Sequence, residues 1–107
     1  MKLAVCIPPA TFLIDDRAFL ALGPIQIATV ARDFAGWRSE VLDLTGHARR
    51  CSKATHDDLC EAEVWMHCEA QIAATPADVY GLYGMSCHVR NCVKLAAMMK
   101  KHWPKAV

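Results

Sequence analysis

Residues 3–9 of this chain read LAVCIPP and give the clearest indication of its fold. Leu3 to Ile7 form one continuous apolar run of strand length, and Pro8-Pro9 end it. A run in which every side chain is apolar is typical of a strand that is buried on both faces, as in a parallel sheet. The sequence therefore predicts a central strand near the amino terminus, with the rest of the chain packed around it.

Helix and strand patterns alternate after this first strand. Gly23-Pro24 predicts the start of a helix, and Gly36 predicts its end. A strand, a helix, a strand and a helix are expected next, over residues 39–44, about 56–74, 78–85 and about 88–103. The order βαβαβα implies right-handed crossovers and a parallel sheet. We therefore expect residues 1–107 to form a single α/β domain, a flavodoxin-like (Rossmann-like) three-layer unit with strand order 2-1-3.

Apolar spacing predicts which helix faces point inward. In the first helix the expected face contains Ile25, Ile27, Ala28, Val30, Ala31 and Phe34. In the second helix it contains Leu59, Met66 and Ile72, with Trp65 beside them, and Thr55 with Asp58 resembles a capping box. In the third helix it contains Val89, Cys92, Val93, Ala96 and Met99.

Composition excludes several classes of function. The net charge of +1 gives no bulk electrostatic reason to bind nucleic acid or an anionic membrane. No signal peptide is recognisable and no apolar stretch approaches the ~20 residues of a membrane span, so a cytoplasmic protein is expected. Six cysteines occur without a C-x-x-C pair, which predicts free thiols and no metal site.

The expected ligand position follows from the strand order. In an open α/β sheet, ligands lie beyond the carboxyl ends of the strands where the chain order reverses, here between the first and third strands. Two connections meet there, Pro8–Gly23 and Met85–His88. The first has sixteen residues and many apolar side chains, whereas such loops usually have about 2–6 residues. It could form the wall of a flat apolar ligand site, or pack as a lid over its own core.

Single residues at this edge have two interpretations each. Gly81 and Gly84 permit the close approach of a ligand or of another backbone. Ser86 could offer its hydroxyl to a ligand or cap the third helix. Arg17 could pair with the neighbouring Asp15 and Asp16 or meet an anionic part of a ligand.

Two further functional alternatives come from the residues alone. Pro104–Val107 reads as the approach to a fourth strand, so the third strand, with Tyr80 and Leu82, is expected to lie at an open sheet edge. The chain could then be a non-catalytic interaction module that forms a homodimer or binds a partner chain through this edge. A small enzyme that uses Cys87 or His88 is the other alternative, although no phosphate-binding or nucleophile-elbow motif is present.

The residues of the long connection resemble a known family. Pro8-Pro9, the run FLIDDR at residues 12–17 and Leu22-Gly23 are similar to the N-terminal cobalamin (B12)-binding domain of B12-dependent radical SAM proteins. The likeness continues through residues 25–34, 40–44 and 78–86 into the third helix, and is loosest over residues 45–75.

The resemblance implies a domain that holds the corrin ring of cobalamin over the carboxyl edge of its sheet. The cofactor-binding residues that it implies are Pro8, Pro9, Phe12, Arg17, Leu22, Gly23, Gly84, Met85 and Ser86, with Ser86 near the nucleotide tail. It implies no catalytic residue and no metal ligand in this chain.

This sequence departs from the family pattern in three ways. The motif D-x-H-x-x-G, whose histidine ligates cobalt, is absent, because no histidine follows Asp15-Asp16-Arg17. The chain stops before the family's fourth strand and glycine-rich turn. The barrel that carries the C-x3-C-x2-C iron–sulfur motif and binds S-adenosylmethionine is also missing. The resemblance thus describes a truncated domain, a natural short protein or a fragment, that does not perform methyl transfer or related radical chemistry by itself.

Overall fold

The computed structural model describes residues 1–9, 21–45 and 58–107. Its elements in chain order are β1 (Lys2–Ile7), α1 (Leu22–Ala35), β2 (Arg38–Asp43), α3 (Asp58–Ala74), β3 (Val79–Leu82), the short 3-10 helix η1 (Ser86–His88) and α4 (Val89–His102). This order confirms the predicted alternation. Gly36 ends α1 in a left-handed conformation with φ 67°, which glycine adopts without steric cost.

The three strands form a parallel sheet in the order β2-β1-β3, as predicted. Val5 of the central strand lies opposite Val41 of β2 and Gly81 of β3. β3 ends at Leu82, three residues earlier than expected. Residues 83–85 instead lead into η1.

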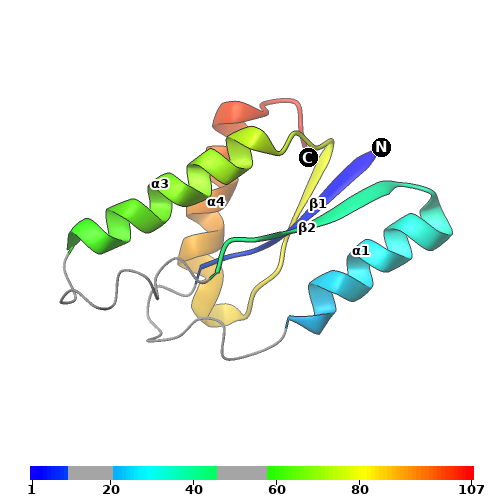
Figure 1. The fold of residues 1–107 in the computed structure, drawn as a ribbon, viewed down its shortest axis with the longest axis horizontal. Helices are drawn as coiled ribbons and strands as arrows, with labels where there is room; N and C mark the ends of the chain where they lie inside the picture. Colours follow the sequence, from blue (N-terminus) through cyan, green and yellow to red (C-terminus); the bar gives the residue numbers. More distant parts are fainter. Residues whose placement is uncertain (10–20, 46–57) are drawn as a thin grey trace.

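Helices cover both faces of the sheet, with α1 on one side and α3 and α4 on the other (Figure 1). The side chains of β1 alternate between the two faces, as in any strand. One core cluster contains Leu3, Val5 and Ala28 of α1. The other contains Ala4 and Cys6 with Leu44, Val64, Trp65, Cys68, Ile72, Leu95 and Met99. Both faces of β1 therefore pack in a core, which explains why the run from Leu3 to Ile7 contains only apolar side chains.

The inward face of α1 is narrower than predicted. Ala28 is buried and Ala31 packs beside it, but the larger apolar side chains of the predicted face are exposed. These are Ile25, Ile27, Val30 and Phe34. Apolar residues occur around most of the circumference of α1, so their spacing could not indicate which side of the helix packs on the sheet. Small side chains face the sheet because they let the helix backbone approach it closely.

The predicted faces of α3 and α4 are also partly wrong. In α3, Ile72 and Trp65 are buried as expected, but Met66 is 70% exposed. In α4, the buried positions are Asn91, Leu95 and Met99, whereas Val89 and Val93 are exposed. The predicted capping box lies outside the described residues, as does the side chain of Leu59.

We expect Phe34→Ser to change the free energy of unfolding by less than about 0.5 kcal/mol, because the Phe34 side chain is 86% exposed. Ala28→Leu on the same helix should cost about 1–3 kcal/mol, since it overpacks the contact with Leu3 and Val5. Urea unfolding followed by circular dichroism measures both. A loss above 1 kcal/mol for Phe34→Ser would contradict the observed orientation of α1.

Candidate functional site

The carboxyl edge of the sheet between β1 and β3 is built by two segments that are far apart in sequence. The first turn of α1 lies against the residues that follow β3. A Cβ atom added to Gly23 would lie 2.8 Å from Cε2 of Tyr83. Tyr83 is held there because its N–H donates to the carbonyl of Cys6 in β1, at 2.9 Å. Gly23 is therefore the residue that lets α1 start directly beside the tyrosine ring.

The turn after Tyr83 is equally close-packed. A Cβ atom on Gly84 would lie 2.9 Å from Cβ of His88 and 3.3 Å from Sγ of Cys92. The N–H of Met85 donates to Nδ1 of His88 at 3.1 Å. When His88 is neutral, its proton is therefore on Nε2. The predicted need for glycine at position 84 thus has a concrete cause, the approach of α4 to the turn.

The residues expected to bind a cofactor have very different surroundings. Pro8 and Pro9 are buried, so their side chains face the protein interior. Leu22, Met85 and Ser86 are exposed at the carboxyl edge, and Gly23 and Gly84 shape the backbone there. Phe12 and Arg17 lie outside the described residues. Five of the nine expected residues thus belong to the start of α1 and the β3–α4 turn, which the fold brings together.

Ser86 does not cap α4. It opens η1, and α4 begins at Val89 with His88 in the N-cap position and no side-chain capping bond. The backbone carbonyl of Ser86 instead accepts the N–H of Val89. The exposed hydroxyl of Ser86 is consistent with the alternative role, contact with a ligand.

Asn91 is a residue of this edge that sequence reasoning missed. It is 7% exposed, and its side-chain amide donates to the carbonyl of Pro9 at 2.7 Å. The bond joins α4 to the end of the β1 segment, 82 residues earlier in the chain. A signal existed, because Asn91, Leu95 and Met99 share one helix face and a polar residue on a core face usually has a structural partner.

Cys87 and His88 make a thiol–imidazole contact of 3.6 Å between Sγ and Nδ1. Nδ1 already accepts the N–H of Met85, so the imidazole is not positioned as a free base for the thiol. In residues 1–9, 21–45 and 58–107, no group of three or more histidine, cysteine, aspartate or glutamate residues could hold a metal ion.

Cys6 has no access to this edge despite its place at the end of β1. It is fully buried, and burial, with a smaller contribution from the carboxylate of Glu40, raises the pKa of its thiol from 9.0 to about 12. Folding therefore favours the neutral thiol. The resulting stability is complete below about pH 9 and is lost as the pH rises toward 12.

We expect the free energy of unfolding to fall above pH 9 by up to about 1.4 kcal/mol per pH unit from this one group. Cys6→Ala removes the titrating thiol, so its stability should fall less steeply over the same range, although it is lower at neutral pH. Urea unfolding of both proteins between pH 7 and pH 10.5 measures the slopes. Equal slopes would show that Cys6 is not protected by the fold.

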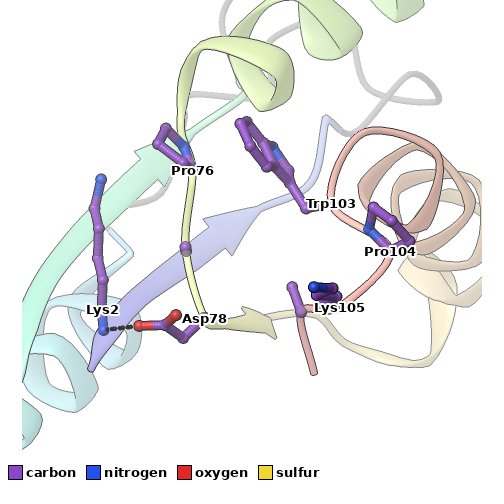
Figure 2. A pocket seen from close by; sticks show the side chains of 8 residues that line it. Lys2, Pro76, Asp78, Trp103, Pro104 and Lys105 are labelled. Atoms are coloured by element: carbon purple, nitrogen blue, oxygen red, sulfur yellow. Dashed lines mark hydrogen bonds between the residues drawn. The ribbon is translucent and has the colours of Figure 1, made fainter.

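A hollow lies at the opposite, amino end of the sheet (Figure 2). It has a volume of about 580 Å³, within the range of small-molecule sites, and its lining is mostly apolar. It is lined by Lys2, Pro76, Ala77, Asp78, Trp103, Pro104, Lys105 and Ala106. It contains none of the residues that the sequence predicted for a site.

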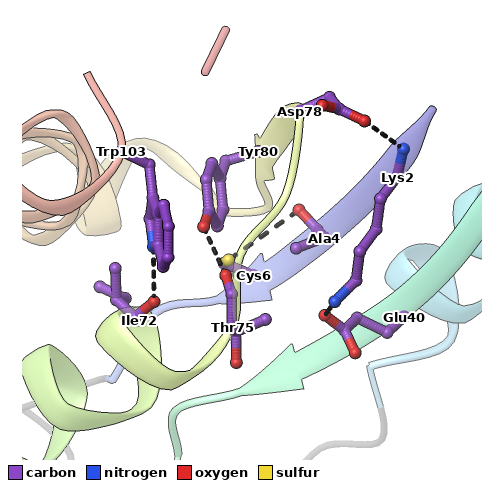
Figure 3. Close-up of polar contacts among 9 residues, drawn as sticks. All are labelled: Lys2, Ala4, Cys6, Glu40, Ile72, Thr75, Asp78, Tyr80 and Trp103. Carbon is purple, nitrogen blue, oxygen red and sulfur yellow. Dashed lines mark hydrogen bonds and ion pairs between the residues drawn. The ribbon is translucent and has the colours of Figure 1, made fainter. Parts of the chain in front are cut away.

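Polar contacts stabilise the walls of this hollow (Figure 3). The backbone N–H of Lys2 donates to the Asp78 carboxylate at 2.7 Å, and Lys2 Nζ lies 2.8 Å from Glu40. The indole N–H of Trp103 donates to the carbonyl of Ile72 at 2.9 Å. These contacts join β1 to β2 and to the residue before β3, and they join the segment after α4 to α3.

Comparison with known proteins gives no match: no family model, no curated protein and no solved structure is significantly similar to this chain. Within the described ranges, no helix has the length and apolar character needed to cross a membrane.

Proposed function

We propose that this chain is a cobalamin-binding module, of the kind found in B12-dependent radical SAM proteins, which holds a corrin ring over the carboxyl edge of its sheet and performs no catalysis by itself. The observation that supports the proposal is the contact between Gly23 and Tyr83. It brings the start of α1 beside the β3–α4 turn at the switch point of the sheet, where ligands of open α/β folds lie.

The exposed side chains at this edge fit the chemistry of a corrin. Leu22, Tyr83 and Met85 are all exposed, and so is Val89, the first residue of α4. Flat macrocycles bind against apolar and aromatic side chains, with a few polar groups to orient them. Ser86 supplies such a group. Bound cobalamin would provide the cobalt chemistry, and these residues would orient the ring and shield one of its faces from water.

Among the described residues, no group of three or more histidine, cysteine, aspartate or glutamate side chains could hold a metal ion, so the proposal assigns no metal ligand to them. The ring would be held by its periphery and by its apolar faces.

Titration of the purified chain with hydroxocobalamin tests the proposal. We expect a shift of the corrin absorbance and co-elution of the corrin with the protein on gel filtration. Met85→Glu should weaken binding at least tenfold, because it puts a charge on an apolar contact surface while leaving the core intact: Met85 is 67% exposed. Lys105→Glu, at the other end of the sheet, is the matched control and should bind as tightly as the unmodified chain.

Free elution of the corrin from the folded chain would refute the proposal. Equal loss of binding in Met85→Glu and Lys105→Glu would show that the corrin does not bind at the carboxyl edge.

The second candidate function is a non-catalytic interaction module that associates through the edge of β3. The sequence predicts this function from an open edge, whereas in the structure Val107 occupies part of that edge, with its N–H donating to the carbonyl of Asp78 and its carbonyl accepting the N–H of Tyr80. The two functions use different parts of the molecule and do not exclude each other.

A further inference from the structure

The hollow at the amino end of the sheet combines flat apolar rings with charged side chains. Figure 2 shows the rings of Pro76, Trp103 and Pro104 along its upper and right sides. In the same view, Asp78 and Lys105 lie on its lower side. An aromatic group packs well against flat apolar surfaces such as the face of an indole. The hollow therefore has an apolar part and a charged part, which suits a ligand that is itself divided in this way.

The charges of Asp78 and Lys105 are available to such a ligand. Lys2 Nζ lies 2.8 Å from the carboxylate of Glu40, so the charge of Lys2 is already paired. The Asp78 carboxylate accepts the backbone N–H of Lys2 through Oδ2 at 2.7 Å. Within residues 1–9, 21–45 and 58–107, neither the Asp78 carboxylate nor the Lys105 ammonium group belongs to an ion pair. One hollow thus presents one negative and one positive group.

Hydrogen bonds within the protein hold the walls of the hollow in place. The indole N–H of Trp103 donates to the carbonyl of Ile72 in α3 at 2.9 Å, which fixes the orientation of the ring. The N–H of Ala106 donates to the carbonyl of Trp103 at 3.0 Å and closes the turn that carries Lys105. A site with ordered walls loses little conformational entropy when a ligand binds.

The segment after Lys105 continues away from the hollow. The N–H of Val107 donates to the carbonyl of Asp78 at 2.9 Å, and the N–H of Tyr80 donates to the carbonyl of Val107 at 2.8 Å. Bonds to both neighbours of Val79 in this sense are the pattern of a parallel pair. The backbone at Val107 is therefore directed along β3 toward its carboxyl end, whereas the hollow lies at the amino end.

We propose that this hollow binds a free aromatic α-amino acid as its zwitterion. The aromatic side chain packs against Trp103 and the two proline rings. The α-ammonium group pairs with Asp78, and the α-carboxylate pairs with Lys105. The volume of about 580 Å³ is large enough for a side chain of one or two rings.

The two charges of the hollow favour a zwitterion over a ligand with one charge. A simple carboxylic acid would bring its charge into the hollow that contains the Asp78 carboxylate, and a simple amine would meet the ammonium group of Lys105. A zwitterion pairs with both groups. The inference goes beyond the proposed function and is independent of it, because the corrin would lie at the opposite end of the sheet.

Titration of the whole chain with L-phenylalanine tests the proposal. The readout is the NMR signal of the indole N–H of Trp103, which belongs to the wall of the hollow. We expect this signal to shift and to reach saturation at millimolar L-phenylalanine. Glycine, which has both charges and no ring, should bind at least about tenfold more weakly, because it buries no aromatic surface.

Two variants separate the contributions of the two charges. Lys105→Ala should weaken the binding of L-phenylalanine about threefold, the effect of one exposed ion pair, and phenethylamine should bind it at least as tightly as it binds the unmodified chain. Asp78→Asn keeps an oxygen that can accept the N–H of Lys2. It should weaken L-phenylalanine by about the same factor, whereas phenylpropionate should bind at least as tightly as before. Lys101→Ala is the matched control and should change nothing, since Lys101 pairs with Glu69 and does not line the hollow.

If the Trp103 signal does not shift at tens of millimolar L-phenylalanine, the proposal is wrong. Equal affinities of phenylalanine, phenethylamine and phenylpropionate in all variants would show that the hollow recognises the ring alone and would overturn the roles of Asp78 and Lys105. Shifts confined to Tyr83 and Met85 would place the amino acid at the carboxyl edge and would overturn the assignment to the hollow.

Discussion

Leu95→Ala should lower the free energy of unfolding by about 3 kcal/mol, and a marginally stable domain of this size would then be partly unfolded at 37 °C. Leu95 is fully buried at the centre of the cluster between the sheet and α3, so its removal leaves a cavity that the surrounding side chains fill only in part. Urea unfolding at 25 °C measures the loss.

Val93→Ala is the matched control for Leu95→Ala. Val93 lies two residues away on the same helix and is 65% exposed, so we expect a change below about 0.5 kcal/mol. Equal losses for the two variants would mean that α4 is rotated about its axis relative to the observed structure.

Asn91→Ala should cost about 2 kcal/mol, because it leaves the carbonyl of Pro9 without the amide that satisfies it in a buried position. The substitution should also destabilise the structure locally, because this bond joins α4 to the segment that follows β1. We expect faster amide exchange at Ile7 in addition to the lower unfolding free energy. Arg90→Ala, one residue away and exposed, should change neither quantity.

If Asn91→Ala unfolds as the unmodified chain does, the bond to Pro9 contributes nothing to stability. Asn91→Ala also bears on the proposed corrin site. Weaker corrin binding with intact far-UV circular dichroism would indicate that Asn91 positions the connection after β1, whereas unchanged binding would limit its role to stability.

Several features of the fold follow from local sequence signals. The apolar run of β1 predicted burial on both faces, Gly36 predicted the end of α1, and the alternation of patterns predicted a parallel sheet in the order 2-1-3. Each of these signals is local. Gly36 marks the end of a helix because glycine readily adopts a left-handed conformation, and helices and strands differ in the spacing of their apolar residues.

The helix faces could not be predicted as well. α1 is apolar around most of its circumference, so the inward positions of Ala28 and Ala31 depended on how closely the helix approaches the sheet. In α4 the true inward face includes the polar Asn91, which made the face through Val89 and Val93 look more apolar than the one that is buried.

The order of elements, the parallel sheet and the position of its switch point could be predicted from the residues, because strand burial, helix ends and crossover handedness depend on local pattern and chirality. The residues that meet at the switch point are known only from the way the helices pack on the sheet. The contacts of Gly23 with Tyr83, of Asn91 with Pro9 and of Val107 with β3 join segments far apart in the chain. Such contacts depend on the distances and rotations at which helices pack on the sheet, and a one-dimensional pattern does not contain these quantities.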